Sequence, residues 1–237
     1  MKIAIMQPYL FPYLGYYQLM RAVDHFVILD DVTYIKGGWI NRNQILVQGR
    51  AGMFSVPLDG GGSHVKICDV QVDGKSYPHW RTKFFKTLTF NYRRAPYFGD
   101  IEPLVAEVIP AQGTAGLPIR QMAAHSLLAV MRYLGLSFSH SLSSEYAKPD
   151  GVKGTDRVLF LCQALGATEY YNPPGGRQLY DRDAFRTRGV ELKFLTPHKV
   201  PYAQRGADFV PWLSMLDILM FNSPEAVRTM LFAYDLS

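Results

Sequence analysis

Short apolar runs and helical patterns alternate along the first thirty residues. Lys2–Met6 is almost wholly apolar and ends at Gln7, before a proline that cannot continue a central strand, which predicts a short buried strand. Residues 14–23 carry apolar side chains at helical spacing, and His25–Asp30 is a second apolar run. Parallel strands joined by one helix end at the same sheet edge, where open α/β sheets bind ligands. We therefore expect Gln7 and the aspartates that end the second run to share that edge.

The pattern changes to short β segments separated by glycine-rich turns over residues 44–75, including Asp59–Gly62, which is typical of hairpins. Helical spacing returns over residues 79–94 and 117–134. We expect this β-hairpin region to be an insertion in the α/β chain.

Strands and a helix alternate again in the second half. The expected elements are strands at 136–142, 168–171 and 190–195, a helix at 157–165, an apolar run at 212–221 and a final helix announced by Ser223-Pro224-Glu225. Such alternation is typical of parallel sheets. The predicted fold is α/β, with a mostly parallel Rossmann-like sheet flanked by helices, the β-hairpin insertion and a helical C-terminus.

Composition supports a globular protein. The chain has 237 residues, 48% of them hydrophobic and 19% charged, so we expect one domain over residues 1–237. The apolar run at the start is too short for a signal peptide or a membrane span, which predicts a cytoplasmic protein. The net charge of +5 favours anionic ligands such as nucleotides, sugar phosphates or RNA. The two cysteines and six histidines show no metal-ligand spacing, and no cofactor motif is found, so neither a metal nor a cofactor is expected.

The richest set of polar residues follows the second strand, in the run DDVTYIKGGWINRN. Its candidate site residues are Asp30, Asp31, Tyr34, Lys36, Trp39, Asn41, Arg42 and Asn43. Two carboxylates followed by a lysine, an arginine and amides can bind a substrate and move protons. Successive strand residues face opposite sides, so we expect only one aspartate to enter the site. In the structural alternative, the aspartates pair with Lys36 and Arg42 in an ordinary polar loop.

The loop after the first strand, QPYLFPYLGYY, is the second candidate. Gln7 and Tyr9 lie in a loop stiffened by two prolines, and a glycine enters the following helix. Nucleotidylyltransferases carry two histidines around such a glycine, whereas Tyr13 and Tyr16 stand here, so that chemistry is not expected. The alternative is an aromatic turn that fills the core.

Isolated residues in the rest of the chain are further candidates. They are His79, which lies beside a tryptophan; Arg157, in the first turn of a helix; Tyr171, in the loop Tyr170–Gly176; and Ser214, Asp217 and Asn222 near the end. Each also has a structural interpretation, and Ser-x-x-Asp in particular resembles a capping box.

These motifs together resemble the WbqC-like family over nearly the whole chain. The resemblance rests on four ordered blocks, IMQPYLFPYLGYYQL, DHFVILDDVTYIKGGWINRNQI, TDRVLFLCQALGATEYY and LSMLDILMFN. It implies hallmark positions at Gln7, Pro8, Tyr9, Asp30, Asp31, Tyr34, Lys36, Trp39, Asn41, Arg42, Arg157, Ser214, Asp217 and Asn222. Thr33 departs from the family, in which glutamine is common. For this family, the transfer of glycine to an amino sugar during surface-polysaccharide assembly has been proposed.

Our leading hypothesis is an acyl or aminoacyl transferase of the glycine type in polysaccharide or specialised-metabolite biosynthesis. The acceptor would be a small amine such as a nucleotide-linked amino sugar, and the donor an activated amino acid such as an aminoacyl-tRNA. Asp30 or Asp31 would be the general base, Lys36, Asn41 and Arg42 would bind phosphate or the oxyanion, and Gln7 and Tyr9 would orient the donor. The alternatives are an RNA- or nucleotide-binding protein, suggested by Arg93-Arg94 and the tyrosine-rich loops, and a degenerate nucleotidylyltransferase-like enzyme.

Overall fold

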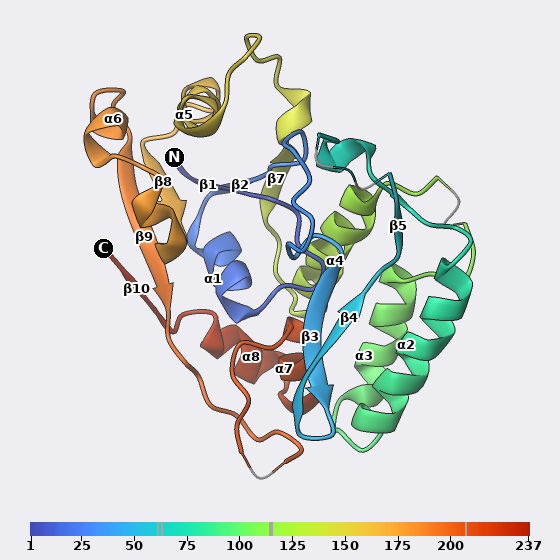
Figure 1. The fold of residues 1–237 in the computed structure, drawn as a ribbon. Coiled ribbons are helices and arrows are strands. Elements are labelled where there is room, and N and C mark those ends of the chain that lie inside the picture. Colours follow the sequence, from blue (N-terminus) through green and yellow to red (C-terminus); the bar gives the residue numbers. More distant parts are fainter. Residues whose placement is uncertain (61, 63, 114–115, 207) are drawn as a thin grey trace.

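A six-stranded sheet organises the protein (Figure 1). The computed structural model describes residues 1–60, 62, 64–113, 116–206 and 208–237. The strands lie in the order β10-β9-β8-β1-β2-β7. Their bounds are β1 (Lys2–Met6), β2 (His25–Ile28), β7 (Ser139–Leu142), β8 (Glu169–Asn172), β9 (Glu191–Pro197) and β10 (Tyr234–Leu236). Strands β7, β2, β1, β8 and β9 pair in parallel, and β10 pairs with β9 antiparallel. This arrangement confirms the predicted mostly parallel α/β fold.

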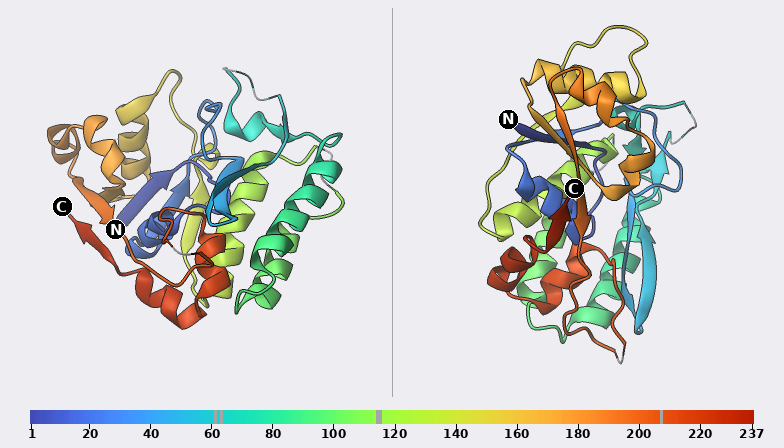
Figure 2. Two further views of the ribbon diagram at one scale, coloured as in Figure 1. Left: turned by 60° about the horizontal axis from the view of Figure 1, so that its bottom comes forward. Right: turned by 90° about the vertical axis from the view of Figure 1, so that its left-hand side faces the viewer.

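Helices cover both faces of the sheet (Figure 2). Ile3 and Ile5 of β1 pack in a core with residues of α5 (Gly154–Ala164) and α6 (Arg182–Arg186). Ala4 points the other way, into the larger core that contains α1 (Leu14–Ala22). Because both of its faces are buried, β1 is a nearly continuous apolar run.

The strand order reverses between β1 and β8. From β1 the chain proceeds through α1 to β2 and later to β7, all on one side of β1. It then returns through α5 to β8, on the other side of β1, and continues through α6 to β9. Ligands of open α/β sheets bind outside the carboxyl ends of the strands at such a reversal.

Separate hairpins form the insertion between β2 and β7. They comprise β3 (Arg42–Val47), β4 (Arg50–Ser55), β5 (Leu58–Asp59) and β6 (Gln71–Val72), in two antiparallel pairs. Gln48 and Gly49 connect β3 to β4 with φ angles of 51° and 77°, as a tight two-residue turn requires. The predicted turn at Asp59–Gly62 includes Gly61, which lies outside the described residues.

The remaining helices surround the hairpins and one face of the sheet. They are α2 (Tyr77–Tyr92), α3 (Phe98–Val108), α4 (Ile119–Tyr133), α7 (Met215–Phe221) and α8 (Pro224–Met230). Single 3-10 turns are η1 (Ile67–Asp69), η2 (Ser143–Glu145) and η3 (Pro174–Gln178). A helical C-terminus was expected from the sequence, and α7 forms within the predicted apolar run, but α3, α6 and the closing strand β10 were not expected. No helix in the described ranges is both long and apolar enough to cross a membrane.

Candidate functional site

A cavity of about 500 Å³ opens at the carboxyl ends of β1, β8 and β9. Its lining residues are Tyr9, Pro12, Tyr13, Trp39, Asn43, Pro174, Thr196, Pro197 and Trp212. We call it the aromatic cavity. Most of its surface is apolar, and none of its lining side chains carries a formal charge at neutral pH. Its position at the reversal of strand order makes it the first candidate for a ligand site.

Side chains from distant elements hold the loop that forms one wall of this cavity. Phe11 has a φ of 43°, an unusual conformation for a residue with a side chain. Its N–H donates to Ser126 Oγ at 2.9 Å, and its carbonyl accepts from Asn43 Nδ2 at 2.9 Å and from Ser214 Oγ at 2.7 Å. Three hydrogen bonds thus fix a strained residue next to the cavity, an arrangement that is concentrated at functional sites.

Trp212 also lines the aromatic cavity and is also strained. Its φ is 61°, no tight hairpin turn accounts for this value, and its side chain is 54% exposed. The indole ring lies edge to face with Tyr13, with ring centroids 6.2 Å apart. An exposed tryptophan held in a costly conformation is suited to contact a ligand rather than to stabilise the fold.

Gly15 allows helix α1 to approach the end of β9. A Cβ atom there would lie 2.5 Å from Pro197 Cγ and 2.5 Å from Tyr13 Cε2. Both residues line the aromatic cavity. The absence of a side chain at Gly15 therefore sets the spacing of two cavity walls.

The tyrosines of the cavity are neutral. Burial raises the pKa of Tyr9, and burial together with the nearby Tyr9 raises the pKa of Tyr13. Their hydroxyl groups remain protonated at physiological pH. They provide aromatic surface and neutral hydrogen-bonding groups, which suits an uncharged ring or acyl chain.

A second, strongly charged group of residues lies at the carboxyl ends of β2 and β7. Asp30 is fully buried there and forms an ion pair with Arg120. Its carboxylate also accepts from Ser144 N at 3.0 Å and from Ser144 Oγ at 2.8 Å, and Ser143 Oγ lies 3.1 Å from it. These partners occupy the carboxylate from several directions, so Asp30 is held as a structural anchor between β2 and β7.

Asp31 is more accessible, with a side chain that is 13% exposed. It accepts from Ser143 Oγ at 2.5 Å, pairs with Lys148 Nζ at 3.0 Å and with Arg157 Nη1 at 3.4 Å. Burial alone would raise the pKa of Asp31, but hydrogen bonds from Ser143 and Lys148 and the charges of Lys148 and Arg157 outweigh it and lower the pKa. Asp31 is therefore ionised at neutral pH.

These groups carry a surplus of positive charge. We define the carboxylate cluster as Asp30, Asp31, Arg120, Lys148 and Arg157. Three cations face two carboxylates, which leaves one positive charge. The cluster is thus better suited to attract a phosphate or carboxylate than a cation.

Gln7 lies between the two regions. It follows β1, which is flanked by β8 on the side of the aromatic cavity and by β2 on the side of the carboxylate cluster. Its carbonyl accepts from Tyr16 Oη at 2.7 Å, and its side chain is partly buried. Lys36 is exposed on the loop after β2. Both side chains are placed where they could contact a bound molecule.

Several other candidates make contacts within the fold. Tyr34 Oη donates to Asn41 Oδ1 at 3.0 Å, and Asn41 Nδ2 donates to the Val56 carbonyl at 2.7 Å. Arg42 donates to the carbonyls of Gly37 and Gly38 and lies over the Trp39 ring, 5.8 Å from its centroid. These residues shape the loop that presents Trp39.

Candidates from the last part of the chain are also engaged. Asp217 is fully buried and accepts from Tyr92 Oη and Tyr202 Oη, both at 2.6 Å, and burial raises its pKa despite these bonds. Ser214 caps α7 by accepting from Leu216 N at 3.2 Å, but the expected capping box is not formed, because the Asp217 carboxylate binds the two tyrosines and Ser214 N donates to the Gln44 carbonyl. Asn222 donates to the Ile218 carbonyl at 2.8 Å.

The last two candidates lie on separate elements. Tyr171 is buried on β8 and donates to Glu169 Oε2 at 3.0 Å. His79 is exposed near the start of α2 and lines neither the aromatic cavity nor the carboxylate cluster.

Sequence reasoning missed partners on both sides of the site. Arg120, Ser143, Ser144 and Lys148 complete the carboxylate cluster, and Thr196, Pro197 and Trp212 line the aromatic cavity. Four of these residues could have been proposed from the sequence: Ser143 and Ser144 follow one predicted strand, and Thr196 and Pro197 follow another. Only the sheet order decides which strand ends are neighbours, and the sequence does not display it.

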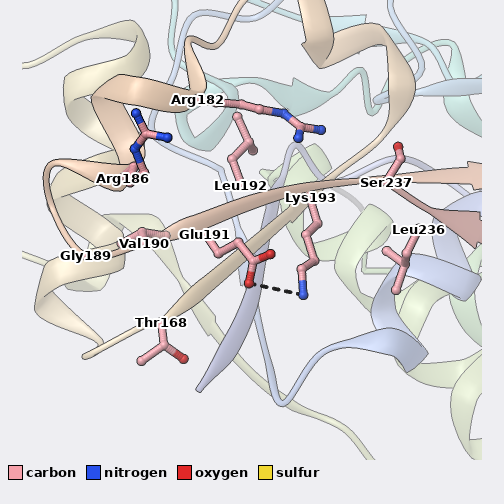
Figure 3. Close-up of a pocket in the computed structure, with 10 residues that line it drawn as sticks. All are labelled: Thr168, Arg182, Arg186, Gly189, Val190, Glu191, Leu192, Lys193, Leu236 and Ser237. Carbon is pink, nitrogen blue, oxygen red and sulfur yellow. Dashed lines mark ion pairs between the residues drawn. The ribbon is translucent and has the colours of Figure 1, made fainter.

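Another cavity, of about 550 Å³, lies at the opposite edge of the sheet, near the starts of β8 and β9 (Figure 3). Lys193 on its wall pairs with Glu191 at 3.3 Å and with Glu169 at 2.7 Å. Its position at the amino ends of the strands makes it a weaker candidate. Within the described ranges, no group of three His, Cys, Asp or Glu side chains could hold a metal ion.

The fold and site define an α/β protein with an aromatic cavity at the strand-order reversal of a parallel sheet. The profile of the WbqC-like protein family matches residues 7–229, and the chain belongs to this family, which confirms the resemblance. It is similar to an uncharacterised protein of Mycobacterium tuberculosis, with 32% identity over 229 residues that cover 95% of each chain. No solved structure matches it.

Proposed function

We propose that the protein is a transferase that moves an acyl or aminoacyl group, of the glycine type, to the amine of a small acceptor such as an amino sugar. The observation that carries this proposal is the pairing of an uncharged aromatic cavity with a positively charged cluster at neighbouring strand ends. The cavity suits a sugar ring, whose apolar faces pack against aromatic side chains. The cluster and Lys36 suit a phosphate on the same molecule.

In this reaction the acceptor nitrogen attacks the carbonyl carbon of the donor. The new N–C bond forms, the bond from that carbon to the leaving group breaks, and one proton leaves the nitrogen. Asp31 is the better of the two aspartates for this step because Asp30 is fully buried and engaged by Arg120. An ionised Asp31 stabilises the positive nitrogen and accepts its proton, although the lowered pKa makes it a weak base.

Gln7 and Tyr9 have a positioning role in this proposal. Tyr9 lines the aromatic cavity and Gln7 lies between the cavity and the cluster, so both can orient the donor carbonyl. The rigid loop that carries them limits the motion of the bound groups, which favours a reactive geometry.

A single-turnover assay tests the proposal. The full chain is mixed with glycyl-tRNA, glycyl-adenylate or a glycyl thioester and with a nucleotide-linked amino sugar, and the product is detected by mass spectrometry. Transfer from one donor supports the proposal, and no transfer from any of them overturns it.

Variants then connect activity to the site. Trp212→Ala should lower transfer about tenfold or more, because a large aromatic contact is lost. Phe232→Ala removes another exposed aromatic residue, which is 62% exposed, away from the cavity lining and should leave transfer unchanged. Equal activities of the two variants would place the reaction outside the aromatic cavity.

A further inference from the structure

Three arginines surround a cavity that is separate from the proposed site. It has a volume of about 520 Å³ and lies between the β3–β4 turn, the end of α2 and the loop at Arg205. Its lining residues are Leu46, Gln48, Gly49, Phe90, Asn91, Arg93, Arg94, Arg205 and Gly206. We call it the arginine cavity. Among the described residues of this lining, none is acidic.

The arginines of this cavity are unpaired. In the described parts of the chain, Arg93, Arg94 and Arg205 form no ion pair. A cation at the end of a helix stabilises the helix dipole, which accounts for Arg93 and Arg94. It does not account for Arg205, which comes from a segment more than a hundred residues away along the chain.

The cavity near the starts of β8 and β9 differs from the arginine cavity in the pairing of its cations (Figure 3). Two of its three cations have carboxylate partners, since Arg186 pairs with Asp183 at 2.7 Å and Lys193 pairs with two glutamates, whereas Arg182 lies over the Phe194 ring, 5.6 Å from its centroid. Cavities of similar volume thus differ in charge: among the described residues, the arginine cavity has three guanidinium groups without a carboxylate partner, whereas the other cavity has one and also contains Glu191. Guanidinium groups bind phosphate with strong, directed hydrogen bonds.

Asn91 links the walls of the arginine cavity. Its Oδ1 accepts from Gln48 N at 3.0 Å, and its carbonyl accepts from Arg205 Nη1 at 3.3 Å. The β3–β4 turn and the Arg205 loop are therefore attached to the end of α2. Phe90 lies on the same helix end, and its ring is 66% exposed within the cavity lining.

We propose that the arginine cavity binds a free nucleotide, with its phosphate on Arg93, Arg94 and Arg205 and its base on the Phe90 ring. An exposed aromatic ring beside cations is suited to stack a base while the cations hold its phosphate. The volume is that of a small-ligand site, which favours a nucleotide over a long polynucleotide. This inference does not rest on transferase activity, because binding is measured without a donor or an acceptor.

Equilibrium titrations with AMP, UMP and pyrophosphate at constant ionic strength test the inference. The double variant Arg94→Gln/Arg205→Gln should weaken binding of all three probes by about tenfold or more, since charged hydrogen bonds are lost. The control Arg182→Gln/Arg186→Gln removes the same charge from the cavity of Figure 3 and should bind like the wild type. Thermal unfolding checks that both variants are folded.

Phe90→Ala separates the two parts of the ligand. It should weaken the binding of AMP and UMP by about fivefold or more, because base stacking is lost, and it should leave the affinity for pyrophosphate unchanged. The inference is overturned if no nucleotide binds, or if the control variant loses as much affinity as the arginine variant. It is also overturned if a 20-nucleotide RNA binds with steep salt dependence while AMP and UMP do not.

Discussion

The carboxylate cluster and the aromatic cavity lie on neighbouring strand ends but are built in opposite ways. In the cluster, Asp30 and Asp31 are surrounded by cations and hydroxyl groups from α4, from η2 after β7, and from α5 and the chain that leads into it. In the cavity, the side chains are uncharged, and Trp39 and Trp212 are 39% and 54% exposed. The two aspartates that stand out in the sequence are thus largely paired with other residues of the protein. The cavity that is open to a ligand is lined by neutral and mainly aromatic side chains.

Removal of Asp30 should have the largest effect on stability. Asp30→Ala leaves Arg120 without its carboxylate in a largely buried environment, which should lower the free energy of unfolding by about 3–5 kcal/mol in urea titrations. Trp39→Ala, in the aromatic cavity, should change it by about 1 kcal/mol or less because its side chain is partly exposed. Similar losses for the two variants would contradict the structural role of Asp30 or the open position of Trp39.

Gly15→Ala tests the walls of the aromatic cavity. Alanine normally stabilises a helix relative to glycine, but here its Cβ would collide with Pro197 and Tyr13, so stability should fall by about 1–3 kcal/mol. The matched control is Gly99→Ala in α3, where a Cβ meets nothing within 4 Å. That change should raise the unfolding free energy slightly, and a gain at both positions would show that the two walls can move apart freely.

The lowered pKa of Asp31 predicts that the stability of the fold falls at acidic pH. Because its pKa is lowered in the folded protein, its ion pairs stabilise the fold above the ordinary value of 3.8 and are lost as the pH falls below it. Asp31→Asn should cost about 1–3 kcal/mol at pH 7, and its difference from the wild type should shrink on acidification below pH 4. A difference that stayed constant down to pH 2 would mean that Asp31 is not the titrating group.

Sequence patterns predicted the central strands and the edge strand β7, but not β10 at the other edge of the sheet. The apolar runs of β1 and β2 are dictated by burial on both faces, which leaves a clear local signal. β8 and β9 keep a signal in their buried aromatic and aliphatic residues although each begins with a glutamate. Strand β10 has three residues and is defined by its pairing with β9, so its own residues predict little. Helix α3 contains a proline and an exposed glycine near its start, both of which weaken a helical pattern.

Tyr9 and Trp39 could be selected from the sequence because each follows a predicted strand at the ligand-binding edge. Trp212 could not, since it lies in a connecting segment and its position beside Tyr13 depends on the path of the chain from β9 to α7. The sequence likewise shows two adjacent aspartates but not their partners. Ser143 lies more than a hundred positions from Asp31, and it becomes a neighbour because β7 pairs with β2.

The sequence by itself determined the α/β class, the family and the edge of the sheet where polar and aromatic loops converge, because these follow from local periodicity and strand ends. Only the tertiary structure decided which residues line open space and which bind one another. Strand order and long-range hydrogen bonds make that decision: they bury Asp30, leave Asp31 partly accessible, and place the walls of the aromatic cavity between β1, β8 and β9.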